Sequence, residues 1–329
     1  MARITDFWKN RRVFVTGPSG LIGSWLVKGL LAEGACVVVL VHDSDPRSEL
    51  YRSADIQRVS VINGVLEDFR VLERAINHYE VDTVFHLGAQ AIVGTAHRFP
   101  LSTFETNIHG TYNLLEACRL HTDLVRRVVI ASSDKIYGEQ PHLPYTEEML
   151  PNGRFPYEVS KRCAELITQT YHCTYGLPVA MMRCGNVYGG GDLNWSRIVP
   201  DTIRSFLQGE RPIIRSDGTY VRDYIYVKDV ACAYMRLAEF LEDRHVLGEA
   251  FNFSTEKPVT VLEMVNVIQK LMGCAHLEPD VRDCAEGEIR SQYLSAEKAR
   301  SILKWKPVFD LESGLCETIA WYKALLGVE

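Results

Sequence analysis

The chain of 329 residues lacks several features that mark special classes of protein. No apolar run approaches the roughly 20 residues of a membrane span, and the polar, basic start has no signal-peptide core. A net charge of -6 argues against a nucleic-acid binder, which normally carries a basic face. None of the cysteines forms a C-x-x-C pair, which argues against disulfides and metal sites. We therefore expect a cytoplasmic protein that binds no metal, nucleic acid or membrane.

The first half of the chain alternates short apolar runs with amphipathic stretches, which is typical of β-α-β units around a parallel sheet. The expected strands are 13–16, 36–41, 59–62, 83–87, 127–131 and 179–184. The expected helices are 21–32, 69–78, 104–120 and 157–175. This order predicts an α/β fold with a doubly wound parallel sheet of the Rossmann type.

After residue 184 the alternation breaks up. A glycine-rich turn at 189–191 precedes expected helices at 198–207, 261–272 and 295–303, with short strands between them. We expect residues 1–184 to form the dinucleotide-binding domain, which also carries the catalytic residues. We expect residues 185–329 to form a smaller mixed α/β domain for the substrate, with strands and helices interleaved at the boundary.

A glycine-rich turn joins the first expected strand to the first helix. Gly17, Gly20 and Gly23 allow a tight turn and the close approach of a pyrophosphate, and the helix start offers free amides and a positive dipole end. Tight turns also need glycine for steric reasons alone. The strand-turn-helix context nevertheless favours a dinucleotide site.

The second expected strand is followed by Asp43. An acidic residue near this place binds the adenosine ribose hydroxyls and repels the extra phosphate of NADP. Asp43 could equally be a solvated turn residue. NAD is the favoured cofactor because no arginine stands at positions 42 and 43 to hold a 2'-phosphate.

Tyr157 and Lys161 stand four residues apart at the start of an expected helix, and therefore one turn apart on one face. A tyrosine near its usual pKa of about 10 is a poor base, but neighbouring positive charge favours its phenolate. The spacing becomes informative together with Ser133, which follows an expected strand, and with the glycine loop.

In combination these motifs resemble the extended short-chain dehydrogenases of the NAD-dependent epimerase/dehydratase family, over nearly the whole chain. The loop at 16–23 is similar to the family's T-G-x-x-G-x-x-G turn, and the segment 86–90 is similar to its cofactor-lining H-L-A-A-Q. Val65 departs from an aspartate that many relatives place near the adenine amine. The resemblance implies NAD-binding roles for Gly17, Ser19, Gly20, Leu21, Ile22, Gly23, Asp43, Leu66, Leu87, Gly88, Ala89, Gln90, Asn107, Tyr157 and Lys161.

The resemblance also implies catalytic roles. By it, Tyr157 takes the proton of a sugar hydroxyl, Lys161 lowers the pKa of Tyr157 and holds the nicotinamide ribose, and Ser133 orients the hydroxyl. A nucleotide-sugar diphosphate is expected at Asn186, Arg197, Arg222 and Arg290. Asn186 could instead stabilise a turn, and any one arginine could be a surface charge.

Asp134 and Lys135, directly after Ser133, bear on the reaction. In the family, 4-epimerases usually have small residues there, and the order serine, aspartate, lysine resembles the CDP-glucose 4,6-dehydratases. Loss of the carbon 6 hydroxyl needs a proton donor, which a buried Asp134 could be. Lys135 stands where other dehydratases have a glutamate base, and a lysine must be neutral for that role.

We therefore expect a nucleotide-sugar 4,6-dehydratase that regenerates its NAD. The first alternative is a 4-epimerase, in which Asp134 is merely structural. The second is a non-catalytic Rossmann-type binding module, against which the intact Ser133, Tyr157 and Lys161 set argues. We also expect a homodimer with a four-helix bundle built from helices 104–120 and 157–175, although their apolar residues could face the sheet instead.

Overall fold

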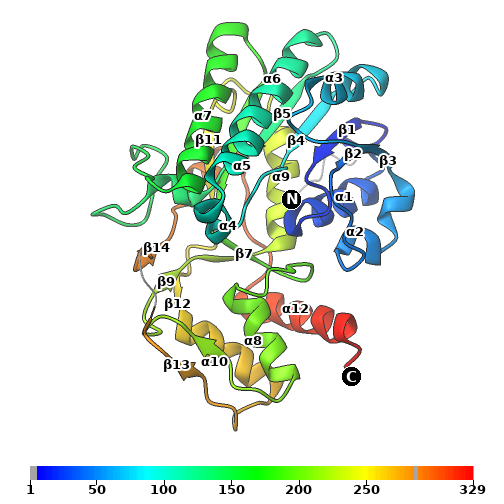
Figure 1. Ribbon diagram of the computed structural model, residues 1–329. Helices are drawn as coiled ribbons and strands as arrows, with labels where there is room; N and C mark the ends of the chain where they lie inside the picture. Colours follow the sequence, from blue (N-terminus) through cyan, green and yellow to red (C-terminus); the bar gives the residue numbers. More distant parts are fainter. Residues whose placement is uncertain (1–5, 285–287, 329) are drawn as a thin grey trace.

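The computed structural model describes residues 6–284 and 288–328. Its main feature is a seven-stranded parallel sheet in the order β11-β6-β5-β4-β1-β2-β3 (Figure 1). The strands are β1 (Arg12–Thr16), β2 (Cys36–Val41), β3 (Ser60–Asn63), β4 (Thr83–His86), β5 (Arg127–Ala131), β6 (Val179–Cys184) and β11 (Ala250–Phe253). The first six follow the doubly wound order of dinucleotide-binding folds. The expected fold class is confirmed.

Alternation along the strands divides the apolar side chains between two cores. In β1, Val13 and Val15 lie in one core and Phe14 in the other. The first core is covered by α1 (Leu21–Ala32) and α9 (Val227–Glu239), and the second by α3 (Phe69–His78), α6 (Gly110–Leu120) and α7 (Pro156–Tyr175). Burial on both faces explains why these strands are almost continuously apolar.

The helix expected at 104–120 is interrupted. α5 (Pro100–Phe104) passes into a π-helical turn, η2 (Glu105–His109), before α6 begins. Asn107 lies in this turn, buried, with its side chain bonded to Gln90 and Ser160. Apolar periodicity predicted a continuous helix because it does not register a polar contact to distant residues.

The later part of the chain builds a smaller mixed unit, drawn below the main sheet in Figure 1. Its strands are β7 (Asn186–Tyr188), β8 (Ile213–Ile214), β9 (Val221–Arg222), β10 (Tyr224–Tyr226), β12 (Val259–Thr260), β13 (Asp280–Val281) and β14 (Ser291–Gln292). They form the groups β10-β7, β12-β9-β14 and β13-β8. The helices α8 (Ile198–Leu207), α10 (Val261–Met272) and α12 (Leu311–Leu326) share a core that includes Ile203, Met264 and Leu315.

Two elements from the later half return to the large sheet. β11 pairs with β6 at the sheet edge, and α9 packs against α1. The division at residue 184 therefore does not separate the two parts in space.

The remaining short elements are α2 (Glu49–Arg52), η1 (Asp55–Arg58), α4 (Val93–Arg98), η3 (Asp134–Tyr137) and α11 (Glu297–Leu303). Along the described ranges, no helix has both the length and the apolar character to cross a membrane.

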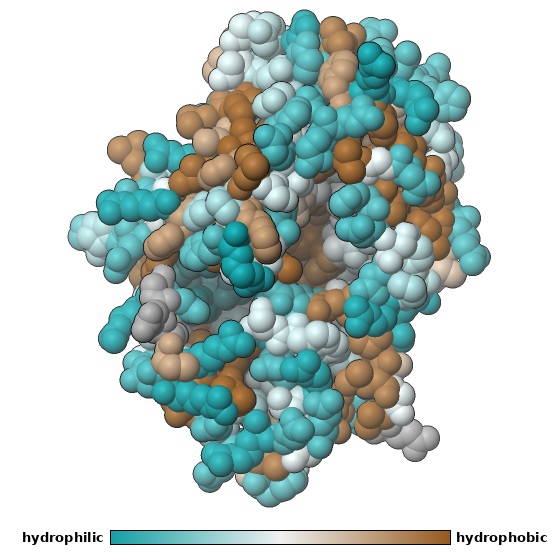
Figure 2. Space-filling view, viewed as in Figure 1, coloured by the Kyte–Doolittle hydropathy of each residue, from teal (hydrophilic) through white to brown (hydrophobic). Residues whose placement is uncertain are grey.

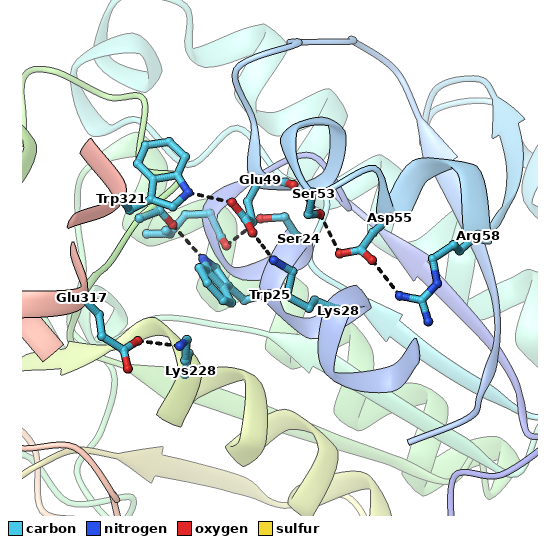
Figure 3. A network of polar contacts seen from close by, with 12 residues as sticks. Ser24, Trp25, Lys28, Glu49, Ser53, Asp55, Arg58, Lys228, Glu317 and Trp321 are labelled. Carbon is cyan, nitrogen blue, oxygen red and sulfur yellow. Dashed lines mark hydrogen bonds and ion pairs between the residues drawn. The ribbon is translucent and has the colours of Figure 1, made fainter. Parts of the chain in front are cut away.

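Polar contacts tie the glycine-loop helix α1 to the smaller unit (Figure 3). Trp25 on α1 donates through Nε1 to the carbonyl oxygen of Gly190 over 2.7 Å. The buried carboxylate of Glu49 pairs with Lys28 on α1 and accepts the Nε1–H of Trp321 on α12 over 2.6 Å. These contacts fix the C-terminal helix relative to the start of the Rossmann fold.

Candidate active site

Two of the loop glycines are required by the chain's own packing. Gly17 has φ +68°, and a Cβ there would lie 2.7 Å from the backbone nitrogen of Gly88. A Cβ at Gly23 would lie 2.0 Å from the carbonyl oxygen of Gly17. The loop therefore folds tightly against the end of β4 and against the first turn of α1.

Gly20 is different, because a Cβ there would meet only the Gly17 oxygen, at an ordinary 3.5 Å. Gly20 is exposed and occupies the N-cap of α1, with no side-chain cap and no acidic residue in the first turn. The helix start is thus open beside Ser19, Leu21 and Ile22. Free amides and a positive dipole end fit a pyrophosphate, so these residues fit the expected dinucleotide.

The strand end after β4 packs beside this loop. Leu87, Gly88, Ala89 and Gln90 are half-buried there. The backbone N–H of Gly88 donates to the Thr16 hydroxyl over 3.0 Å, and a Cβ at Gly88 would lie 3.0 Å from the buried side chain of Leu66. Figure 2 shows a hollow on this face, between the region of α4 and α5 and that of α1 and α2.

A buried hydrogen-bonded chain that the sequence did not predict runs from this strand end toward α6. His86 Nδ1 lies 2.8 Å from the Thr16 hydroxyl, and its Nε2 lies 3.0 Å from the Thr111 hydroxyl. Because Thr111 donates to the Asn107 carbonyl oxygen over 2.6 Å, it accepts from Nε2–H, so His86 is the neutral Nε2–H tautomer. Burial, followed by the charge of Lys161, lowers the pKa of His86 to about 3.

Asn107 links the same strand end to the catalytic helix. Its side-chain oxygen accepts the N–H of Gln90 over 2.7 Å, and its amide donates to the Gln90 carbonyl and to the Ser160 hydroxyl over 3.1 and 2.9 Å. Ser160 in turn donates to the carbonyl oxygen of Tyr157 over 2.7 Å. Asn107 therefore fixes backbone on both sides of the expected nicotinamide site.

Asp43 lies in the turn after β2, with its side chain exposed. Its carboxylate is 3.2 Å from Nδ1 of His42. The neighbouring Arg47 is paired with Asp45 over 2.9 Å. The acidic side chain is thus at the predicted strand end and accessible to a ribose.

Tyr157 and Lys161 lie one turn apart at the start of α7, and both are buried. The helix begins here because the Glu158 carboxylate accepts the N–H groups of Arg154 and Phe155 over 2.7 and 3.1 Å. Lys161 donates to the Ala131 carbonyl oxygen at the end of β5. The catalytic helix is therefore anchored at its first turns.

The protein's own groups disfavour the phenolate of Tyr157. Burial raises the pKa of Tyr157 to about 12, with the hydrogen bond to Ser133 lowering it and the charge of Asp134 raising it. Burial also lowers the pKa of Lys161 to about 8, against the charge of Glu165. Burial is thus the largest influence on the pKa of both groups, and the expected lowering of the Tyr157 pKa by Lys161 stays a prediction.

Ser133 and Asp134 sit together where β5 ends and η3 begins. The Ser133 hydroxyl donates to the Asp134 carboxyl over 3.1 Å and accepts the backbone N–H of Lys135 over 3.2 Å. Burial raises the pKa of Asp134, whereas the charges of Lys135 and Arg222 and the bond to Ser133 lower it. A buried carboxyl with a raised pKa is suited to hold and donate a proton. Lys135 itself donates to Gln292 over 3.3 Å, a residue that the sequence did not single out.

The expected diphosphate residues lie on short elements of the smaller unit. Arg222 on β9 is buried, and its guanidinium donates to the carbonyl oxygens of Val221 and Arg290 over 2.9 and 3.1 Å and pairs with Glu288 over 3.3 Å. Arg290 is exposed and lies over the ring of Tyr220, as does Arg222. The two arginines are therefore neighbours.

The other two expected contacts lie nearby in the chain. Asn186 begins β7, and its side chain is hydrogen-bonded to Tyr224. Arg197 caps α8 and pairs with Asp192 over 3.0 Å. The charge of Arg197 lowers the pKa of Tyr157, so this arginine lies close enough to Tyr157 to act on it electrostatically.

Arg183, at the start of the segment that contains Asn186, has a structural role. Its guanidinium forms two hydrogen bonds to Glu165 on α7, over 2.8 and 2.6 Å, and a third to the Tyr137 hydroxyl over 2.7 Å. Both members of the ion pair are buried. The pair joins β6 to the catalytic helix.

Over 6–284 and 288–328 there is no group of three or more side chains that could hold a metal ion.

The class of protein is defined by four features: a Rossmann sheet, a glycine loop, a serine after β5, and a tyrosine and a lysine at the start of α7. Together they are typical of enzymes of the extended short-chain dehydrogenase type. Comparisons with known proteins agree, because residues 13–253 match the NAD dependent epimerase/dehydratase family. The chain belongs to this family, which confirms the resemblance and NAD as the cofactor.

The relatives include enzymes of two kinds. A CDP-glucose 4,6-dehydratase of Salmonella typhimurium is 31% identical over 97% of this chain and 92% of its own length. A UDP-glucose 4-epimerase of Thermotoga maritima, solved with UDP-glucose, has a TM-score of 0.88 and 30% identity, over 96% of this chain and 99% of that chain. A dTDP-glucose 4,6-dehydratase of Bacillus anthracis, solved with NAD, has a TM-score of 0.84 and 26% identity, over 95% of this chain and 97% of that chain.

Proposed function

We propose that the protein is a 4,6-dehydratase that converts a nucleoside-diphosphate hexose into the 4-keto-6-deoxyhexose. The observation that carries this proposal is Asp134, a buried carboxyl bonded to Ser133, with a pKa raised by burial. A carboxyl that keeps its proton can transfer it to the leaving carbon 6 oxygen, so that water departs. The similarity to a CDP-glucose 4,6-dehydratase along nearly the whole chain supports it.

NAD, held at the glycine loop and by Lys161, would supply the hydride chemistry at carbons 4 and 6 of the hexose. Tyr157 takes the proton of the 4-hydroxyl, which Ser133 orients. Because the pKa of Tyr157 is about 12 in the protein alone, this role depends on positive charge brought in with the cofactor. Lys161, whose pKa is about 8, is largely protonated at neutral pH and can hold the nicotinamide ribose.

The open start of α1 is the place for the pyrophosphate of NAD, and Asp43 for its adenosine ribose. We propose the substrate diphosphate at Arg222, with Asn186, Arg197 and Arg290 as further contacts. A guanidinium suits two phosphate oxygens because its donors form a planar fork. A cycle that returns its hydride has no need to release NAD, so NAD is expected in the supernatant of the purified, denatured protein.

A 4-epimerase is the second candidate, supported by the structural similarity to the UDP-glucose 4-epimerase of Thermotoga maritima. The test is to incubate the purified protein with CDP-, UDP-, dTDP- and GDP-linked glucose and to follow the products by mass. A dehydratase forms a product lighter by one water, whereas an epimerase changes no mass but alters the sugar. Failure to convert any nucleotide sugar would contradict both and favour a non-catalytic module.

We also propose a homodimer through α6 and α7. The sheet-facing side of α6 carries the buried Leu114 and Leu115, whereas Tyr112 on α6 and Leu166 and Tyr175 on α7 are exposed. Figure 2 shows apolar surface over α7. Outward apolar side chains on two adjacent helices suit a four-helix bundle with a second copy. Light scattering at micromolar concentration should give a dimer, and Leu166→Arg a monomer; a wild-type monomer contradicts the proposal.

A further inference from the structure

Gln292 is a buried neutral residue that contacts Lys135, the residue directly after Asp134. It lies on β14, which pairs in parallel with β9 so that Gln292 is opposite Arg222. Gln292 is 1% exposed. Its side-chain oxygen accepts a hydrogen bond from Nζ of Lys135 over 3.3 Å. Its buried amide nitrogen has no hydrogen-bond partner among residues 6–284 and 288–328.

This carboxamide lies next to two residues whose charges act on Asp134. Lys135 directly follows Asp134, and the charges of Lys135 and Arg222 both act on the Asp134 carboxyl. Gln292 contacts the first of these cations and is the strand neighbour of the second. An orphaned buried amide costs about 1–3 kcal/mol in general, so the N–H groups of Gln292 are available to a partner that can accept from them.

A carboxamide has a property that a carboxylate or an apolar side chain lacks. Its oxygen can accept from an ammonium group, and its NH2 can donate to a neutral amine. It can therefore hold a lysine in place in either charge state. A carboxylate at the same position would favour the ammonium form. A methionine or leucine would hold neither form by hydrogen bonding.

We propose that Gln292 is a positioning residue that holds the Lys135 amine beside the substrate without fixing its charge, so that the neutral amine can take the proton from carbon 5. The inference rests on the proposed dehydratase function. The C5–H bond breaks, a new N–H bond forms on Lys135, and the electron pair enters an enolate on the 4-oxygen. That pair then forms the C5–C6 double bond while the C6–O bond breaks, and the Asp134 proton leaves with the oxygen as water.

Other charged and titratable groups lie on the elements around Lys135. Asp134 and Tyr137 lie in the same short helix η3, Arg222 lies on β9 and is paired with Glu288, and Glu158 lies on α7. These groups are unchanged in substitutions at position 292. A change in the pH midpoint of Lys135 in such a variant can therefore be attributed to the side chain at position 292.

The experiment compares wild type, Gln292→Glu and Gln292→Met as NAD-loaded proteins. Lysine labelled with 13C at Cε is incorporated, and the Lys135 signal is assigned by its loss in Lys135→Met. In Gln292→Glu the pH midpoint of this signal should move up by about one unit or more. In the same variant, uptake of solvent deuterium at carbon 5 should begin at a correspondingly higher pH, and below both midpoints its rate should be about tenfold lower than in wild type. Gln292→Met should lower the rate of deuterium uptake without moving its pH profile.

A double-mutant cycle is a second test, and it does not require that Gln292→Glu folds. If Gln292 acts through Lys135, Gln292→Met should cause no further loss of turnover in a Lys135→Met background. Additive losses of turnover in the double variant would overturn the role of Gln292. An unchanged 13C midpoint and pH profile in Gln292→Glu would do the same. Neither result would contradict the dehydratase function. Absence of a dehydrated product from the wild-type protein contradicts the proposed function itself, and with it the elimination role given to Gln292.

Discussion

The ammonium group of Lys161 donates a hydrogen bond to the carbonyl oxygen of Ala131 over 2.8 Å. This contact joins α7 to the end of β5, the strand that leads into Ser133 and Asp134. The two halves of the catalytic set are thus joined by a contact that involves neither Asp134 nor Tyr157. Conservative substitutions at Asp134 and Tyr157 should therefore alter the chemistry while leaving the geometry intact.

Asp134→Asn should separate the two stages of the reaction. In the proposed reaction the first hydride transfer does not need the Asp134 proton, whereas loss of the 6-oxygen does, so reduced cofactor should accumulate on the enzyme. A missing general acid is expected to slow elimination by about 100- to 10,000-fold. Absorbance of the reduced cofactor after mixing with substrate measures the first stage, and product mass the second. Wild-type turnover in Asp134→Asn, with no loss of water in either enzyme, would favour the epimerase.

Tyr157→Phe should block the reaction at its outset. In the proposed mechanism the phenol takes the 4-hydroxyl proton, and it is hydrogen-bonded to Ser133 in a buried site. Without it, no reduced cofactor should form on mixing with substrate, in contrast to Asp134→Asn. Retention of bound NAD serves as the control for folding. Reduction of the cofactor at the wild-type rate would remove Tyr157 from the mechanism.

Gly20→Ala and Gly23→Ala form a matched pair in the glycine loop. The added Cβ meets only an ordinary 3.5 Å contact at Gly20 but lies 2.0 Å from a backbone oxygen at Gly23. Gly23→Ala should therefore lower the free energy of unfolding by about 1–3 kcal/mol, as overpacking does. Gly20→Ala should change stability little but reduce the NAD retained after purification. Denaturant titration and cofactor assay measure the two effects; undiminished NAD in a folded Gly20→Ala protein contradicts the pyrophosphate site.

The buried pair of Glu165 and Arg183 should be a major source of stability for the catalytic helix. Glu165→Gln leaves the Arg183 guanidinium buried without its anion, which typically costs about 3–5 kcal/mol. The double variant Glu165→Leu with Arg183→Met should cost less, because neither charge is then left unpaired. Urea titration of the three proteins measures this, and a double variant as unstable as Glu165→Gln would count against the argument.

His86 should make the protein less stable at mildly acidic pH. Its pKa falls from 6.5 to about 3 on burial, so between these values the unfolded chain binds a proton that the folded protein does not. The free energy of unfolding therefore decreases as the pH falls through this window, by about 1.4 kcal/mol per pH unit from this residue. Between about pH 7.5 and 5, wild type should lose about 2 kcal/mol more than His86→Asn. Equal losses would show that His86 is not held neutral.

The local features of the fold were predictable from the sequence. The expected strands at 36–41, 127–131 and 179–184 and the helices at 21–32 and 69–78 coincide with β2, β5, β6, α1 and α3. Each is a run whose apolar period decides its type within a few residues. β11 was not predicted, because four residues show too little periodicity and its place depends on pairing with β6.

The same division holds in the candidate site. The sequence determined the glycine loop and the spacing of Ser133, Tyr157 and Lys161, since a turn needs glycine locally and a helix places i and i+4 on one face. Only the tertiary structure decided the tautomer of His86, the pairing of Arg183 with Glu165 and the contact between Lys135 and Gln292. The partners in these contacts are 18 to 157 residues apart. Burial and hydrogen bonding between such distant segments have no local pattern, so only the folded chain specifies them.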